Sequence, residues 1–388
     1  MRQATNAIGI CGMIPLMDSL RRTRSIYFFS LAAIGVITAW LFNGLAVMRG
    51  EDYLKAWFGT SVDWVLSADL LIVAIAGSSF MIIEGRRLGM RRIWLYLVLA
   101  GITAMAFVFP LFLAMRERAL ARLEAASGKI ETFHLDNRRI DVLVPADLGP
   151  DTPVLVMHDG KGLLVDKKLT WNGQNWQIPE AISSGRVKAP GRTPLVVGVF
   201  IDETKGRFNE LAPEDILARH PEFWTQINEV LLPADRTFRG NDYQDFLASR
   251  LLPSIAEKYG IELDRNRTAI GGASMGGLAT LYALGRHPEV WGAGLAVSTH
   301  WPLGGEVMAS ELAAALPVGD GQLIWQDCGT LDVDAPYLPV QLKFVEALEK
   351  RGLKRDVDFA ASVFAGTGHN ENWWAARVHL PINWWLNR

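Results

Sequence analysis

The stretch from Ile270 to Ala279 reads IGGASMGGLA and sets Ser274 among glycines and small or apolar residues. It contains the pattern G-x-S-x-G, in which a serine sits on a sharp strand-to-helix turn that exposes its hydroxyl. The context agrees, because Arg267–Ile270 is typical of a strand and Met275–Arg286 has helical spacing. The stretch therefore predicts a serine placed for nucleophilic chemistry at the end of a strand.

Around this stretch, short apolar or β-branched runs alternate with segments of helical periodicity from about residue 129 onward. This alternation predicts an α/β fold with a mostly parallel sheet flanked by helices. The expected strands are Ile140–Val144, Pro153–Met157, Pro194–Phe200, Arg267–Ile270, Ala293–Val297, Gln322–Trp325 and Phe359–Val363. The expected helices include Asp242–Lys258, Met275–Gly285, Pro336–Arg351 and Glu371–Ala376. The polar segment Ser127–Arg139 fits either an edge strand or a linker.

A serine nucleophile needs a base, and the base needs a third group that holds its tautomer. In sheets of this kind the partners follow in the order serine, acid, histidine. His369 lies in the loop FAGTGHN directly after an expected strand, so we expect it to be the base. His287, His300 and His379 fit less well, and we expect them to be surface or packing residues.

Three aspartates compete for the role of the acid, in the segment QDCGTLDVD that follows the expected strand GQLIW. Asp327 lies at the very end of that strand and could instead cap the loop. Asp332 lies farther along the loop, with the reach to meet a histidine from the neighbouring strand, so it is the expected acid. Asp334 and Asp327 remain the alternatives.

The oxyanion of the tetrahedral intermediate needs preorganised donors, which are commonly two backbone N–H groups. One is expected from Met275, the residue after the nucleophile. The loop HDGKG (His158–Gly162) follows an early strand, and Gly160 lets the chain turn there, so the amide of Lys161 is expected to be the second. A simple β-turn is the alternative reading of this loop, which lacks the spacing of a phosphate-binding loop.

The first third of the chain has a different character, with three apolar windows that approach the ~20 residues needed to cross a bilayer. They are residues 26–48, 64–83 and 93–115, and we expect three transmembrane helices in a domain of residues 1–125, followed by a second domain of residues 126–388. Asp69 lies near the start of the second window, where an ionisable group is costly unless it reaches the interface or a partner.

Lysine and arginine in the flanks indicate the orientation of these helices. Arginines are frequent before the first window and between the second and third, whereas Arg49 and Lys55 are accompanied by acidic residues. This bias places the N-terminus in the cytoplasm, and three crossings then place the second domain outside. Arg116, Arg118 and Arg122 favour the opposite side.

Charge and cysteine content exclude several classes of function. The net charge of −2 gives no indication of nucleic-acid binding. Cys11 and Cys328 are the two cysteines, far apart in the sequence, so neither a disulfide framework nor a cysteine metal site is expected. No cofactor is expected.

Several ordered motifs of the second domain resemble the esterase family that includes enterochelin esterases, S-formylglutathione hydrolase and the mycolyltransferases. The resemblance covers about residues 130–385 and rests on the segments VLVMHDGKGLL, VVGVFIDETKGRFNELAP, DFLASRLLPSIAEKYG, AIGGASMGGLATLYALGRHPEVWG, DCGTLD and GTGHNENWW. Enterochelin-type enzymes carry an N-terminal β-sandwich domain that has no counterpart here. In the membrane domain, EGRRLG and FVFPLFLAMRERAL resemble a family of small three-helix bacterial membrane proteins of unknown activity.

The esterase resemblance implies an α/β-hydrolase fold and an acyl-serine intermediate, with Ser274, Asp332 and His369 as the catalytic residues. It also points to Arg207 and Glu210, which match a motif R-x-x-E-x-x-P; a structural ion pair between them is favoured over a substrate clamp. Trp373 and Trp374 follow the histidine, and core packing is favoured over an aromatic wall for the substrate.

The leading hypothesis is a membrane-tethered serine hydrolase acting on a small-molecule carboxylic ester. Acyl transfer to a cell-envelope acceptor is a second hypothesis, because the sequence does not distinguish water from another acceptor. A non-catalytic binding protein with a hydrolase fold is a third, and the presence of nucleophile, acid and base argues against it.

Overall fold

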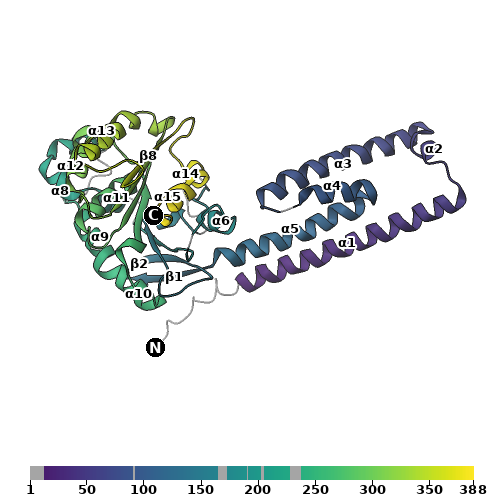
Figure 1. Ribbon diagram of the computed structural model, residues 1–388, viewed down its shortest axis with the longest axis horizontal. Helices are drawn as coiled ribbons and strands as arrows, with labels where there is room; N and C mark the ends of the chain where they lie inside the picture. Colours follow the sequence, from purple (N-terminus) through teal and green to yellow (C-terminus); the bar gives the residue numbers. More distant parts are fainter. Residues whose placement is uncertain (1–12, 91, 165–172, 190, 202–204, 228–236) are drawn as a thin grey trace. The chain divides into compact units, whose positions relative to one another are not determined.

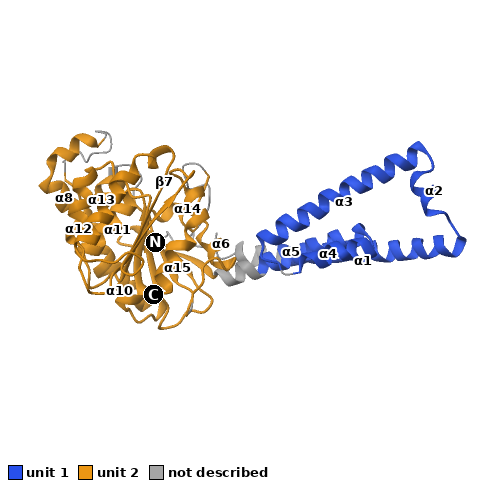
Figure 2. Ribbon diagram, turned by 45° about the horizontal axis from the view of Figure 1, so that its top comes forward, with its two compact units in different colours: residues 1–124 blue, residues 125–388 orange. Residues whose placement is uncertain are grey.

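The computed structural model of the chain describes residues 13–90, 92–164, 173–189, 191–201, 205–227 and 237–388. These residues form two compact units, which divide between Glu124 and Ala125 (Figure 2). Unit 1 consists of helices, and unit 2 is built around a single large sheet.

The sheet of unit 2 has eight strands in the order β1-β2-β4-β3-β5-β6-β7-β8. The pairs β1–β2 and β2–β4 are antiparallel, and every pair from β4–β3 to β7–β8 is parallel. The strands are β1 (Lys129–Leu135), β2 (Arg138–Val144), β3 (Val154–Met157), β4 (Leu195–Val199), β5 (Thr268–Ala273), β6 (Ala293–Val297), β7 (Leu323–Gly329) and β8 (Phe359–Phe364). The mostly parallel sheet is therefore confirmed, and Ser127–Arg139 contributes an edge strand.

Both faces of this sheet are buried, as the short apolar strands require. Strand β3 shows this directly, because Val154 and Val156 belong to one apolar core while Leu155 and Met157 belong to the other. Side chains alternate along a strand, so one run of four apolar residues serves both cores. Helices consequently flank the sheet on both sides (Figure 1).

The helices of unit 2 connect the parallel strands and leave the functional loops at the strand ends. They are α6 (Ile178–Ser183), α7 (Lys205–Leu211), α8 (Glu214–Arg219), α9 (Gly240–Phe246), α10 (Leu252–Tyr259), α11 (Met275–Arg286), α12 (Gly305–Ala315), α13 (Tyr337–Lys350), α14 (Glu371–Arg377) and α15 (His379–Leu386). The expected helix over 242–258 corresponds to α9 and α10 joined by a π-helical turn, Leu247–Leu251.

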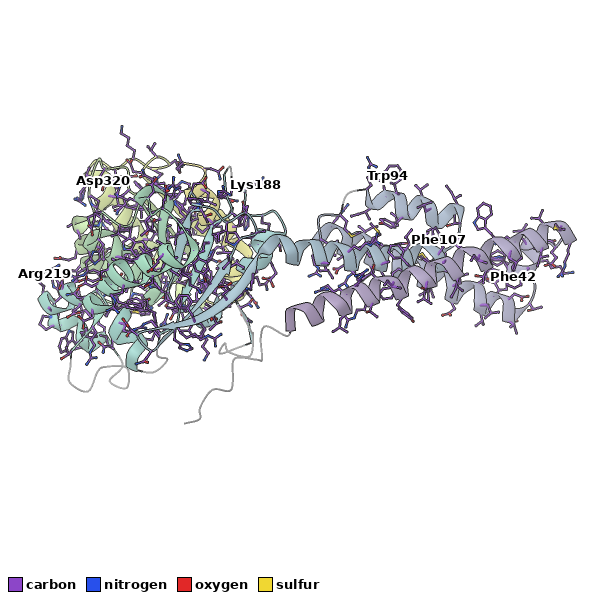
Figure 3. All side chains as sticks on the ribbon, turned by 90° about the horizontal axis from the view of Figure 1, so that it is seen from below. Phe42, Trp94, Phe107, Lys188, Arg219 and Asp320 are labelled. Atoms are coloured by element: carbon purple, nitrogen blue, oxygen red, sulfur yellow. The ribbon has the colours of Figure 1, made fainter. Side chains whose placement is uncertain are left out.

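Unit 1 consists of α1 (Met13–Arg49), α2 (Tyr53–Phe58), α3 (Ser61–Arg87), α4 (Ile93–Ile102) and α5 (Met105–Ser127). Within its described residues, Leu20–Arg49 and Ser61–Arg87 are long and apolar enough to cross a membrane. Large apolar side chains such as Phe42 on α1 and Trp94 on α4 project outward from unit 1, and each is more than half exposed (Figure 3).

The expected third membrane helix, residues 93–115, is not a single helix. It breaks after Ile102, where both the backbone N–H and the hydroxyl of Thr103 bond to the carbonyl of Leu99. This side-chain bond competes with helix continuation, and Thr103 has non-helical dihedrals. The apolar window predicted from composition is therefore divided between α4 and α5.

Candidate active site

Ser274 lies on a strained turn between β5 and α11. Its φ of 60° and ψ of −122° are rare for a residue with a side chain. The turn is held because the Ser274 N–H donates to the carbonyls of Val297 and Ser298, at 3.1 and 3.2 Å. Such strain persists where surrounding structure enforces it, and it is concentrated at functional sites.

The glycines around Ser274 are required by close packing. A Cβ at Gly272 would lie 3.0 Å from the ring of His158, and one at Gly277 would lie 2.8 Å from the hydroxyl of Thr299. A Cβ at Gly276 would also lie close to His158, at 3.3 Å. The glycines around Ser274 therefore allow the turn that carries it to pack closely against His158 and Thr299.

The carboxylate hydrogen-bonded to His369 is Asp334, which corrects the expectation of Asp332. His369 Nδ1 and Asp334 Oδ1 are 2.6 Å apart, and Asp334 is fully buried. Residues Asp332–Asp334 form a single 3₁₀ turn, in which Asp332 has a φ of 54° and is exposed, with its carboxylate packed against Gly368. This turn directs the side chain of Asp334 inward, toward the histidine.

Asp334 accepts two further hydrogen bonds on its other oxygen. Ser298 Oγ and the backbone N–H of Gly329 each donate to Asp334 Oδ2 at 2.7 Å. Burial alone would raise the pKa of Asp334, but the bonds from His369, Ser298 and Gly329 outweigh burial and lower it. The carboxylate is therefore stabilised in its ionised form.

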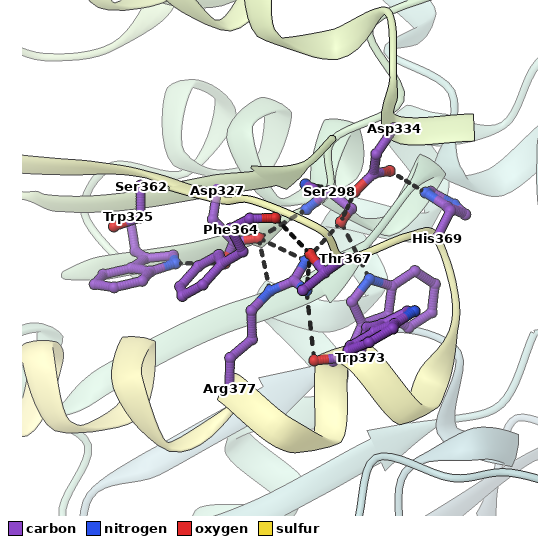
Figure 4. A network of polar contacts seen from close by, with 12 residues as sticks. Ser298, Trp325, Asp327, Asp334, Ser362, Phe364, Thr367, His369, Trp373 and Arg377 are labelled. Atoms are coloured by element: carbon purple, nitrogen blue, oxygen red, sulfur yellow. Dashed lines mark hydrogen bonds and ion pairs between the residues drawn. The ribbon is translucent and has the colours of Figure 1, made fainter. Parts of the chain in front are cut away.

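A buried ion pair between Arg377 and Asp327 lies next to this arrangement (Figure 4). Arg377 donates from Nη2 to Ser298 Oγ at 2.8 Å and to Asp327 Oδ1 at 3.0 Å. Trp374 Nε1 also donates to Ser298 Oγ, at 3.1 Å. Because both acceptor positions of the Ser298 hydroxyl face N–H groups, its single proton is directed to Asp334.

Asp327, the other aspartate considered as the acid, belongs to this supporting layer. It bonds to Arg377 and to Trp325 Nε1, at 2.9 Å from the latter, and it is fully buried. Burial raises its pKa, against the opposing effect of the Arg377 guanidinium.

Ser274 and His369 line one pocket of about 260 Å³. Within the described part of the chain they share it without a direct hydrogen bond, and such bonds commonly tighten only when substrate binds. His158, Trp176, Trp374 and Ile201 also line this pocket, as do the charged residues Asp159, Lys161, Arg207 and Glu371.

Candidate oxyanion donors lie on two elements beside this pocket. Met275 is the first residue of α11, so its N–H belongs to the first turn, where no intrahelical acceptor exists. Lys161 lines the pocket from a short 3₁₀ turn, Gly160–Gly162, after β3. Gly160 is buried and lets this turn approach β4, because a Cβ there would lie 2.6 Å from the backbone of Gly198.

Arg207 and Glu210 do not pair with each other, contrary to the sequence-based expectation. Arg207 makes a bidentate ion pair with Asp159 at 2.7 and 2.8 Å, whereas Glu210 pairs with Arg138 at 2.6 and 2.8 Å. Both residues lie on α7, but Arg207 faces the pocket and Glu210 faces β2. Arg207 thereby braces the loop that carries Lys161.

Of the two tryptophans that follow His369, Trp374 lies at the pocket and Trp373 does not. Trp373 is 39% exposed and does not line the pocket, while Trp374 lines it and is buried. The Trp374 ring lies edge-on to His369, with centroids 5.0 Å apart, and 5.2 Å from Trp176. These contacts confine the imidazole of His369.

Two further histidines are held neutral near the site. His158 Nδ1 lies 2.9 Å from the hydroxyl of Tyr243, and His300 Nδ1 lies 2.9 Å from that of Tyr337. Burial lowers the pKa of each to about 4. By contrast, His287 pairs with Asp245 and Glu289.

Sequence reasoning did not identify Ser298, Arg377 or Asp159 as parts of the site. Ser298 and Arg377 act through neighbours from other elements, so no local motif marks them. Asp159 lies in the HDGKG loop, but its partner Arg207 is 48 positions away in the sequence. The sequence carries one weak indication for Arg377. It lies eight positions after His369, on a helix that packs against the sheet, where a charged residue needs a partner.

Residues 136–379 match a family described as "Putative esterase". The chain belongs to this esterase family. Residues 27–118 match a second family, described as "Protein of unknown function DUF2834". The comparison with curated proteins gives no match.

Solved structures similar to the esterase unit include the enterobactin esterase from Shigella flexneri, at 19% identity and a TM-score of 0.47. That match covers 67% of this chain and 58% of the other. An enterobactin and salmochelin hydrolase matches at 17% identity and a TM-score of 0.43, covering 67% of this chain and 95% of that one. A ferulic acid esterase matches at 17% identity and a TM-score of 0.44, covering 67% and 97%.

Proposed function

We propose that this chain is a membrane-anchored serine esterase in which Ser274 is the nucleophile, His369 the general base and Asp334 the residue that orients the base. The observation that carries the proposal is the 2.6 Å contact between the buried Asp334 and His369, which lines the same pocket as Ser274. Membership of the esterase family supports it.

In this mechanism, His369 Nε2 accepts the proton of Ser274 Oγ as that oxygen attacks the carbonyl carbon of the ester. The tetrahedral intermediate collapses, the bond to the alcohol oxygen breaks, and His369 returns the proton to the departing alcohol. Water then attacks the acyl-serine with His369 again as base, which releases the acid and restores Ser274. Asp334 keeps the proton of His369 on Nδ1, so that Nε2 can accept another.

The backbone N–H groups of Met275 and Lys161 are the proposed donors to the oxyanion. The N-terminus of α11 adds a favourable dipole, because partial positive charge gathers where N–H groups lack intrahelical acceptors. Loss of one such donor typically costs about 3 kcal/mol of transition-state stabilisation.

The pocket suits a small ester with an apolar or aromatic part. Trp176, Trp374 and Ile201 supply apolar wall, whereas Arg207 and Lys161 supply positive charge next to Asp159 and Glu371. Water is the proposed acceptor of the acyl group.

The proposal is tested on the full-length membrane protein with a fluorophosphonate probe and with p-nitrophenyl esters of graded chain length. We expect covalent labelling and hydrolysis, both abolished in Ser274→Ala. Ser310→Ala is the matched control, because Ser310 is exposed on α12 and its hydroxyl bonds to the Glu306 carbonyl within the same helix. Labelling that persists in Ser274→Ala would refute the assignment of the nucleophile.

We further propose that unit 1 anchors the esterase in a bacterial-type cytoplasmic membrane. The long apolar helices α1 and α3, with large side chains exposed along them, support this. The protein should stay in the membrane fraction at alkaline pH and leave it only with detergent. The side on which the esterase lies depends on the number of complete crossings, and the outer side predicted from the sequence requires three.

A further inference from the structure

Helix α5 runs antiparallel to α1 within unit 1. Arg21 pairs with Glu117 at 3.4 Å, and Ser25 Oγ donates to the carbonyl of Ala114 at 3.3 Å. Farther along, Gly35 contacts the carbonyl of Ala106 so closely that any Cβ there would clash. Pro110 has no N–H to donate to that carbonyl, which leaves it open to this close approach. Residues that come later in α1 therefore contact residues that come earlier in α5, as antiparallel packing requires.

Helix α3 runs parallel to α5. Gly77 is close to Met105 and Phe109, the ring of Phe80 lies 6.0 Å from that of Phe109, and Glu84 pairs with Arg116 at 2.8 Å. The C-terminal end of α3 thus lies level with residues 116–117 of α5, and these lie level with Arg21 near the start of α1. One charged cluster, Arg21, Glu84, Arg87, Arg116 and Glu117, joins three helices at this end of unit 1.

The chain reverses between α4 and α5. The rings of Tyr96 and Phe112 are 5.5 Å apart, although a continuous helix would separate residues 16 positions apart by about 24 Å. The reversal occurs at Thr103 and Ala104, whose side chains are partly buried. Helices α4 and α5 therefore form a hairpin.

The tip of this hairpin lies well along α1 from the charged cluster. Gly35, level with Ala106, is ten residues beyond Ser25, which is about 15 Å along α1. The hydrocarbon core is about 30 Å thick. Helix α4 has ten residues, or about 15 Å, so it can reach the middle of the core but cannot cross it. Non-helical backbone at that depth needs protein cover, which α1 and α3 provide through Gly35 and Gly77.

We propose that unit 1 crosses the membrane twice, through α1 and α3, and inserts α4 and α5 as a re-entrant hairpin, so that the chain leaves unit 1 on the cytoplasmic side at which it enters. The arginines beside all three helix ends then lie on one side. The described residues there are Arg21, Arg22, Arg24, Arg86, Arg87, Arg92, Arg116 and Arg118. The opposite end carries Arg49 and Lys55 beside Glu51, Asp52 and Asp63.

This topology removes a conflict in the sequence. With three crossings, the arginines after residue 115 lie on the outer side, against the tendency of basic loops to stay in the cytoplasm. With two crossings and a hairpin, every arginine-rich flank lies on the cytoplasmic side, as this tendency requires. If the proposed esterase activity also holds, its substrate is an ester that reaches the cytoplasmic side of the membrane.

The topology is tested by cysteine labelling of the full-length protein in intact cells whose outer membrane has been permeabilised, with a maleimide that cannot cross the inner membrane. Cys11→Ser provides the background, since Cys328 is fully buried. Ala56 on α2 and Ala314 on α12 are both exposed and uncharged. Each is replaced by cysteine in a separate variant, Ala56→Cys or Ala314→Cys. We expect Ala56→Cys to react in intact cells and Ala314→Cys to react only after lysis.

Other labelling patterns overturn the topology. Reaction of both cysteines from outside would indicate three crossings, and reaction of Ala314→Cys alone would indicate the inverted orientation. Protection of both would show that α1 and α3 do not cross. Esterase activity of each variant is measured separately in detergent, so a failure of the proposed activity is distinct from a failure of the topology.

Discussion

Substitution of Asp334 by asparagine separates the two candidate acids. The buried carboxylate receives three donors: His369 on Oδ1, and Ser298 and Gly329 on Oδ2. An asparagine has one carbonyl oxygen and one NH₂ group, so it cannot accept from both sides. The arrangement that satisfies Ser298 and Gly329 directs the NH₂ group toward His369 Nδ1.

That amide stabilises the wrong tautomer of His369. Nδ1 becomes an acceptor and the proton moves to Nε2, which can then no longer accept the proton of Ser274. The corresponding change in a serine protease triad reduces kcat about 10⁴-fold, equivalent to roughly 5.4 kcal/mol. We expect a loss of similar size in Asp334→Asn, with little change in packing because the side chains are isosteric.

The assay compares kcat/KM for a p-nitrophenyl ester, together with the rate of fluorophosphonate labelling, in Asp334→Asn and Asp332→Asn. Asp332 is exposed, so its variant should remain within about threefold of the parent, as surface substitutions usually do. Thermal unfolding of both variants shows whether the fold is retained. A folded Asp334→Asn with near-normal activity, or a 10³-fold loss in Asp332→Asn, would refute the reasoning.

Three further predictions follow from the same geometry. Ser298→Ala removes the hydroxyl that accepts from Arg377 and Trp374, so the unfolding free energy should fall by about 1–3 kcal/mol and kcat/KM by tens of fold. Denaturant titration and ester-hydrolysis kinetics measure these two effects, and unchanged values would contradict a role for this network. Gly277→Ala places a Cβ 2.8 Å from Thr299 Oγ1, so fluorophosphonate labelling of Ser274 should slow markedly. Gly191→Ala is the control, because a Cβ there meets nothing within 4 Å among the described residues, and its labelling rate should not change. Burial lowers the pKa of His158 and His300 to about 4, so the folded protein binds protons less readily than the unfolded chain, and its stability should fall as the pH decreases from about 6.5 to about 4. Each histidine should contribute roughly 3 kcal/mol to this loss of unfolding free energy. A melting temperature that stays constant across that range would contradict their burial as neutral rings.

The sequence predicted the sheet and the nucleophile turn because both depend on local pattern. Strands buried on two faces read as short apolar runs, and the glycines near Ser274 mark close packing that only small residues permit. The expected strand Ala293–Val297 coincides with β6. The strand expected over Arg267–Ile270 corresponds to β5, which continues three residues farther, to Ala273.

The identity of the acid could not be read from the sequence. Asp327, Asp332 and Asp334 lie within eight positions, and a single 3₁₀ turn decides which carboxylate faces inward. The expected pairing of Arg207 with Glu210 fails for a related reason. An i, i+3 spacing on a helix permits that contact, but partly buried partners on other elements, Asp159 and Arg138, bind the two residues instead.

The helix break at Thr103 is invisible to hydropathy. An apolar window reports composition, and α4 with the first half of α5 has the composition of one continuous span. The direction of the chain depends on pairings such as Tyr96 with Phe112, which only the folded structure displays.

The buried network under the site also has a definite balance of charge. Asp327 and Arg377 neutralise each other, which leaves Asp334 as the carboxylate that faces His369. In the proposed mechanism His369 becomes positively charged only while the ester bond is being broken or the acyl-serine is being attacked. In that mechanism the positive charge that develops on His369 lies against the Asp334 carboxylate, so this contact stabilises the transition states more than the resting state.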